Sequence, residues 1–169
     1  MKEVITRTML LLLLALFTAP LNGHAADHGI DSTSAVVKEI GQAKSEILVQ
    51  AYSLTSKDIA ESLADAHKRG VRTQIILDKS SRSRKYSVAD FTRGAGIPTY
   101  IDAEHDIPEN RTIIIDRETV ITDSFNFTRA TGERNTENLL ILRSNELANM
   151  YIDNWNRHRN HSGEYAESQ

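Results

Sequence analysis

The chain has 169 residues and a formal net charge of −3 at pH 7, with 20 basic and 23 acidic side chains. The sequence contains no cysteine, which excludes disulfides, thiolate metal sites and thiol catalysis, so a hydrophobic core or contacts between subunits must stabilise the fold. A slightly acidic balance also argues against a general nucleic-acid-binding protein, which is strongly basic. Any phosphate ligand must therefore bind to a local patch of side chains.

The first 25 residues have the pattern of a secretory signal peptide. A short basic start precedes an apolar run over residues 9–17, and small residues at 23–25 suit cleavage after Ala25. The run is too short to span a membrane. We therefore expect a signal peptide at 1–25, one domain without a membrane span at 26–169, and a periplasmic or secreted protein. An uncleaved N-terminal anchor is the alternative.

Helices and strands are expected to alternate in the first half of this domain, because helical spacing of apolar residues and short continuous apolar runs follow one another. The expected elements are a helix capped by Ser32 or Ser34, a strand at 47–52, a helix capped by Ser56 that ends before Gly70, a strand at 72–78, a basic loop at 79–85, a helix at 88–95 and a strand at 97–101.

A hairpin is expected in the second half, with strands at 112–115 and 119–122. The elements expected after it are a buried strand at 139–142, a helix capped by Ser144 with Leu147, Met150, Tyr151, Asn154 and Trp155 on one side, and a frayed polar tail from His158 that includes His161. This order predicts an α/β fold, a layered α/β/α domain with a mixed β-sheet.

Polar side chains stand at the predicted strand ends of the second half. They are Arg111, Asp116, Ser124, Asn126 and Glu137. A cation, a hydroxyl, an amide and carboxylates together suit an anionic ligand such as a phosphate. Arg111, Ser124 and Asn126 are the expected phosphate-binding residues, since each offers hydrogen-bond donors.

These residues resemble the motif of the phospholipase D superfamily, His-x-Lys-x4-Asp followed by Gly-Ser-x-Asn. Further segments are similar, in order and spacing, to the small exported single-motif bacterial nucleases of that superfamily: Gln-Ala-Tyr-Ser at 50–53, Lys-Arg-Gly-Val at 68–71, Gly-Ile-Pro at 96–98 and Ser-Phe-Asn-Phe-Thr at 124–128. The resemblance covers most of the chain after residue 30.

The resemblance implies hydrolysis of phosphodiesters, in nucleic acid or phospholipid, without a metal or other cofactor. It also implies a homodimer, in which two motif copies face each other across one pocket. One motif His attacks the phosphorus and the partner His protonates the leaving group, while the Lys, Ser and Asn hold the phosphate oxygens.

The chain departs from the motif at the residues that carry this chemistry. Glu109 stands in place of the His, Arg111 in place of the Lys, and Asp123 in place of the Gly. The positions that match by residue type are Asp116, Ser124, Asn126 and Glu137. The resemblance implies that these four, together with Glu109 and Arg111, are the catalytic residues. We expect an impaired phosphodiesterase with Glu109 in the catalytic position; the alternative is a catalytically inactive phosphate- or nucleic-acid-binding or scaffold homodimer. His105 could supply an imidazole if its loop shifted, although a histidine at the rim of the site is the favoured interpretation.

Overall fold

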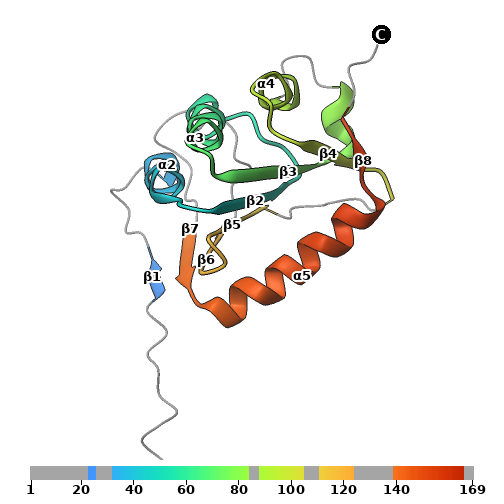
Figure 1. The fold of residues 1–169 in the computed structure, drawn as a ribbon. Coiled ribbons are helices and arrows are strands. Elements are labelled where there is room, and N and C mark those ends of the chain that lie inside the picture. Colours follow the sequence, from blue (N-terminus) through green and yellow to red (C-terminus); the bar gives the residue numbers. More distant parts are fainter. Residues whose placement is uncertain (1–22, 26–31, 84–87, 105–110, 124–138, 166–169) are drawn as a thin grey trace, which may run out of the picture.

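The computed structural model describes residues 23–25, 32–83, 88–104, 111–123 and 139–165 (Figure 1). The strands are β1 (Gly23–Ala25), β2 (Glu46–Ala51), β3 (Arg72–Asp78), β4 (Thr99–Asp102), β5 (Arg111–Ile115), β6 (Thr119–Asp123), β7 (Leu139–Arg143) and β8 (Gly163–Glu164). The helices are α2 (Ser32–Gln42), α3 (Lys57–Lys68), α4 (Val88–Gly94) and α5 (Asn145–His161), with a 3₁₀ turn, η2, at Lys79–Ser83.

All eight strands belong to one mixed sheet, in the order β1-β7-β6-β5-β2-β3-β4-β8. The neighbours β2, β3 and β4 run parallel, and the other pairings are antiparallel. Helices α2, α3 and α4 cover one face of the sheet and α5 crosses the other (Figure 1). The predicted layered α/β/α domain with a mixed sheet is therefore confirmed.

Apolar side chains fill both faces of the sheet, which explains why its central strands are apolar without interruption. On the α2–α3 face, Ile40 and Leu63 pack with strand residues such as Val49. On the α5 face, Trp155 packs with strand residues such as Ile76. The indole nitrogen of Trp155 also donates a hydrogen bond to the backbone carbonyl of Val49, at 3.0 Å, and so ties α5 to the middle of the sheet.

Local sequence signals define the helix starts as expected. The hydroxyl of Ser56 accepts from the backbone N–H of Ile59, and that of Ser144 accepts from Leu147. Each serine satisfies a backbone donor that the first turn of its helix leaves free. The hairpin of β5 and β6 also forms as predicted.

Two predictions for the last quarter of the domain were wrong. Strand β7 is only partly buried, with Leu140 39% exposed, because it lies near the outer side of the sheet rather than at its centre. Of the predicted apolar side of α5, Leu147, Tyr151 and Trp155 do pack against the core, together with Ala148 and Ile152, but Met150 is 64% exposed.

The C-terminal tail is also more ordered than the sequence indicated. His158 and His161 lie within α5 rather than in a frayed tail. The chain then turns back, and β8 pairs antiparallel with β4 through Tyr100 and Glu164. A guanidinium group from the same helix, that of Arg159, stacks 3.4 Å above the Tyr100 ring.

Gly23–Ala25, at the end of the predicted signal peptide, form β1 against β7. Among the residues that the structure describes, no helix has the length and apolar character required to cross a bilayer. The predicted apolar run at 9–17 lies outside the described residues, and the signal peptide remains a prediction.

Candidate functional site

The parallel strands β2, β3 and β4 all end on the same side of the sheet, which we call the carboxyl end. Because β5 runs antiparallel to β2, β5 starts there, β6 ends there and β7 starts there. The residues at these strand ends are Ala51, Asp78, Asp102, Arg111, Asp123 and Leu139. The carboxyl end therefore gathers strand ends that are up to 88 positions apart in the chain (Figure 1).

Arg111 is the sequence-predicted phosphate ligand that the structure describes at this end. It pairs with Ala51 of β2 and is only 8% exposed. Alternation along β5 places it on the same face as Ile113, the face covered by α2 and α3. A nearly buried guanidinium at a strand end has the charge and the donor geometry to bind a phosphate.

The other expected members of the pocket adjoin neighbouring strand ends in sequence. Strand β6 ends at Asp123, which pairs with Leu139 at the start of β7. The chain positions of Glu109, Ser124, Asn126, Glu137 and His105 lie outside the described residues. The structure thus brings together the ends of β5, β6 and β7, between which the motif is distributed.

Asp116 occupies the opposite end of the sheet, in the turn between β5 and β6. Its carboxylate accepts hydrogen bonds from the backbone N–H groups of Lys44, Ser45 and Glu46, at 2.9, 2.8 and 3.0 Å. The Ser45 hydroxyl donates a further bond of 2.8 Å. Asp116 therefore fastens the hairpin turn to the start of β2.

These contacts also set the ionisation of Asp116. Partial burial opposes the charged form and alone would raise the pKa, but the hydrogen bonds from Glu46, Ser45 and Lys44 outweigh it and lower the pKa below its ordinary value of 3.8. Asp116 and Arg117 both have positive φ, 53° and 59°. Aspartate tolerates this conformation better than most residues.

The structure does not bring Asp116 and Arg111 together. They stand at opposite ends of β5, and a strand advances about 3.3 Å per residue, which separates them by roughly 16 Å. The sequence places Asp116 in the motif. Its position in a turn was the one sequence signal for a structural role, in which its side chain bonds to the backbone of another segment.

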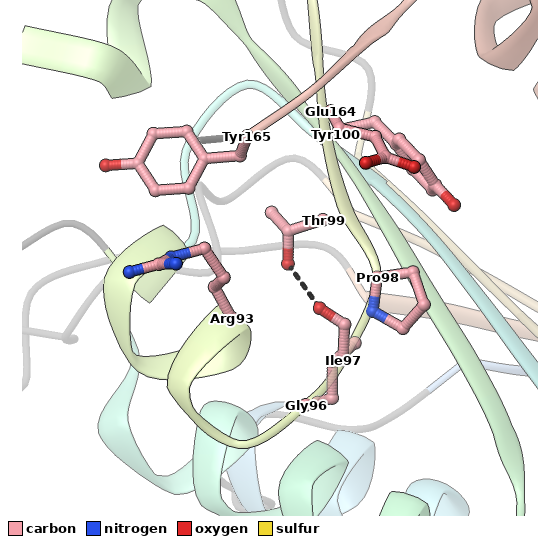
Figure 2. Close-up of a pocket in the computed structure, with 8 residues that line it drawn as sticks. All are labelled: Arg93, Gly96, Ile97, Pro98, Thr99, Tyr100, Glu164 and Tyr165. Atoms are coloured by element: carbon pink, nitrogen blue, oxygen red, sulfur yellow. Dashed lines mark hydrogen bonds between the residues drawn. The ribbon is translucent and has the colours of Figure 1, made fainter. Parts of the chain in front are cut away.

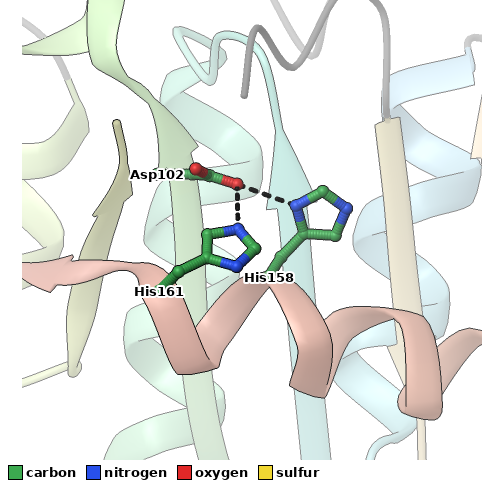
Figure 3. Close-up of side chains that lie close together, drawn as sticks. All are labelled: Asp102, His158 and His161. Atoms are coloured by element: carbon green, nitrogen blue, oxygen red, sulfur yellow. Dashed lines mark hydrogen bonds and ion pairs between the residues drawn. The ribbon is translucent and has the colours of Figure 1, made fainter. Parts of the chain in front are cut away.

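The structure also shows a cluster that the sequence analysis missed. Asp102, at the end of β4, is fully buried and faces the last turns of α5. One of its oxygens, Oδ2, lies 2.7 Å from His158 Nδ1 and 3.1 Å from His161 Nε2 (Figure 3). The spacing of the two histidines, three residues on one helix, is the signal that could have indicated a shared face.

A pocket of about 290 Å³ lies at the other end of β4 (Figure 2). Its lining residues are Arg93, Gly96, Ile97, Pro98, Thr99, Tyr100, Glu164 and Tyr165. The Tyr165 hydroxyl donates to Asp90 of α4 and so holds the C-terminal segment beside the pocket. Because β4 begins here and ends at Asp102, the pocket is separate from the carboxyl end.

Comparison with known proteins agrees with this geometry. The family described as "Cardiolipin synthase, PLD-like domain" matches residues 36–159. The crystal structure of Nuc from Salmonella typhimurium, a phospholipase D family member, is similar with a TM-score of 0.78 and 30% identity, covering 88% of this chain and 99% of that one. The chain belongs to the phospholipase D superfamily.

Similar sequences carry names from the same superfamily. A protein named phospholipase D from Rickettsia felis is 41% identical over 123 residues, which cover 73% of this chain and 62% of that protein. The mitochondrial cardiolipin hydrolase of the dog is 25% identical over 130 residues, covering 77% of this chain and 51% of that protein. The match thus spans less than two thirds of the length of these relatives.

Proposed function

We propose that the chain is a phosphodiesterase of the phospholipase D superfamily with reduced activity, acting on nucleic acid or phospholipid. The observation that carries this proposal is the meeting of β5, β6 and β7 at the carboxyl end. Arg111, Asp123 and Leu139 mark the three strand ends there. They adjoin in sequence the positions at which the superfamily motif is recognised.

The substitutions in the motif are the reason for reduced activity. Glu109 replaces the motif His. Its carboxylate repels a phosphodiester, and with an ordinary pKa of about 4.3 it does not exchange protons near neutrality as imidazole does. Arg111 keeps the positive charge but presents a planar fork instead of a point charge. Asp123 adds a further negative charge next to Ser124 in the sequence.

A homodimer is part of the proposal, because one motif copy supplies half of a two-motif pocket. The two copies would meet through the carboxyl end, around the Arg111 side of the sheet. Light scattering at micromolar concentration tests this directly. A monomer under those conditions would contradict the dimer.

Reversion of the motif tests the chemistry. The variant with Glu109→His, Arg111→Lys and Asp123→Gly should hydrolyse bis(p-nitrophenyl) phosphate on the order of 10³-fold faster than the parent protein, because residues that act as a unit in a nucleophilic site carry effects of this size. The gain should persist in the presence of a chelator. Adding Ser124→Ala to the reverted protein is the matched control and should remove much of the gain.

Two outcomes would contradict different parts of the proposal. A reverted protein that is folded and dimeric but inert would show that the pocket is not inherited from an active phosphodiesterase. A parent protein that already turns over rapidly would show that the substitutions do not impair it. Parallel assays with plasmid DNA, RNA and cardiolipin vesicles would then identify the substrate class.

A phosphate-binding homodimer without catalytic activity is the second candidate, favoured by the nearly buried Arg111 at the carboxyl end. Calorimetry with inorganic phosphate should then detect weak binding that salt weakens, since the attraction is partly Coulombic. Arg111→Ala should abolish the binding. Absence of binding in the parent protein would leave a scaffold role for this end of the sheet.

Export to the periplasm or the outside of the cell is proposed from residues 1–25. Cleavage after Ala25 would remove β1 and leave β7 as the outer strand. The intact mass of the protein recovered from the periplasm or the medium tests the cleavage. A full-length mass would favour the uncleaved anchor.

A further inference from the structure

We propose that Asp102, His158 and His161 bind a divalent transition-metal ion, with Zn²⁺ the preferred one. Each of the three residues offers one ligand atom, and these atoms all lie within 4.8 Å of one another. Figure 3 shows both imidazole rings, from α5, turned toward the carboxylate at the end of β4. Asp102 ends β4 at the carboxyl end, and none of the three residues belongs to the superfamily motif.

The ligand set matches what zinc requires. Two imidazole nitrogens and one carboxylate oxygen are a donor set found in zinc sites that have three protein ligands. A water molecule takes the fourth position in such sites. Zn–N and Zn–O bonds of about 2.0–2.1 Å place tetrahedral ligand atoms about 3.4 Å apart. The nitrogens now stand 2.7 and 3.1 Å from Asp102 Oδ2, so small rotations of the two rings would admit the ion.

The surroundings of Asp102 favour this role. Its other oxygen, Oδ1, accepts a hydrogen bond of 3.1 Å from the backbone N–H of Glu104, which orients Oδ2 toward the histidines. Partners of this kind fix the geometry of metal ligands. Asp78 stands in register beside Asp102 on β3, and it is also buried. Two neighbouring carboxylates in a buried setting raise the local negative potential, which attracts a cation.

Solvent can reach the histidines although the carboxylate is covered. The side chains of His158 and His161 are 17% and 22% exposed, whereas that of Asp102 is 0% exposed. The rings pack edge to face, with centroids 5.4 Å apart. An ion can therefore reach the cluster from solvent through the two partly exposed rings.

Metal binding here would join three parts of the domain. The last turns of α5, the end of β4 and the segment that continues through Glu104 would share one centre. Asp102 lies on the α5 face, the face of Tyr100, whereas Arg111 lies on the face of Ile113. We expect the ion to act on the stability of the fold.

Calorimetry with ZnCl₂ on the chelator-treated, tag-free full chain tests the proposal. We expect about one equivalent bound per chain, with His158→Gln and His161→Gln each weakening binding at least about 10-fold. Zinc at 100 times its Kd should raise the Tm of the parent protein by about 5–10 °C, because an ion that binds the folded state alone stabilises it by mass action. Co²⁺ should give the d–d absorption of a tetrahedral site.

His67→Gln is the matched control, since His67 is a histidine on α3, outside the cluster. It should bind zinc as the parent protein does. The proposal is overturned if the parent protein binds no zinc, or if both cluster variants bind it as tightly as the parent. Circular dichroism should confirm that both cluster variants remain folded. Calorimetry, Tm and Co²⁺ absorption do not measure turnover. They therefore test the metal site whether or not the protein is a phosphodiesterase.

Discussion

Replacing Asp116 by Asn should destabilise the domain, although the residue lies far from the carboxyl end. The carboxylate accepts four hydrogen bonds, from Lys44, Ser45 and Glu46. A carboxamide keeps one acceptor oxygen and turns its NH₂ group toward at least one N–H donor. Asn also tolerates positive φ, so the substitution changes the hydrogen bonds while leaving the turn conformation accessible.

The expected loss follows from these bonds. A hydrogen bond to a charged group contributes about 1.5–3 kcal/mol and a neutral one about 0.5–1.5 kcal/mol. Since the group is partly exposed, solvent reduces the difference, and we expect a total loss of about 2 kcal/mol. For a domain of this size that corresponds to a Tm about 4–8 °C lower at pH 7.

The loss should also depend on pH in a defined direction. The pKa of Asp116 is lower in the folded state than its ordinary value of 3.8. Its carboxylate therefore contributes stability that is fully present above the ordinary pKa and disappears as pH falls through the folded pKa. The difference in Tm between the parent protein and Asp116→Asn should be constant from about pH 5 to pH 7 and shrink below about pH 4.

Thermal denaturation followed by circular dichroism at several pH values measures both effects. Asp153→Asn is the matched control, because it makes the same charge change at an exposed position of α5 and should shift the free energy of unfolding by less than about 0.5 kcal/mol. Equal Tm values for Asp116→Asn and the control at pH 7 would refute the structural role of this carboxylate.

Two further substitutions test how the helices are held. Trp155→Phe should lower the free energy of unfolding, measured by urea denaturation, by about 2 kcal/mol. The substitution leaves the Val49 carbonyl without its indole donor and opens a small cavity. A loss below about 0.5 kcal/mol would argue against that contact. Ser56→Ala should lower the free energy of unfolding by about 0.5–1 kcal/mol. This is at the low end for a helix cap, because the hydrogen bond from Ile59 is 3.4 Å long. Ser56→Thr keeps the hydroxyl and should retain most of this stability. An unchanged unfolding midpoint for Ser56→Ala would show that the Ser56 cap does not stabilise α3.

Several elements could be predicted from the sequence because their signals are local. Strand β3 was predicted with its observed bounds, since its apolar run is short and lies between a glycine turn and a polar segment. The caps Ser56 and Ser144 each act on an N–H group three residues away. The order of helices and strands then determined the layered α/β/α class.

The position of the motif could be inferred from its residues, but its geometry depends on pairing between distant segments. Arg111 lies opposite Ala51 because β5 pairs with β2, and the sequence contains no signal for that partner. Asp116 belongs to the same motif by spacing, yet its side chain bonds to residues 70–72 positions earlier in the chain. A sequence motif gives the order of its residues along the chain, but it does not show at which end of the sheet each residue lies.

The cluster of Asp102, His158 and His161 was decided by the tertiary structure alone. Its carboxylate and imidazoles are 56 and 59 positions apart. The sequence showed a polar C-terminal segment, and polarity by itself is typical of a frayed tail. Packing of Ile152 and Trp155 against the sheet fixes the orientation of α5, and this orientation carries the two histidines to the end of β4. Periodicity along a helix determines which residues share a face, whereas the strand that this face meets is set by the fold of the whole chain.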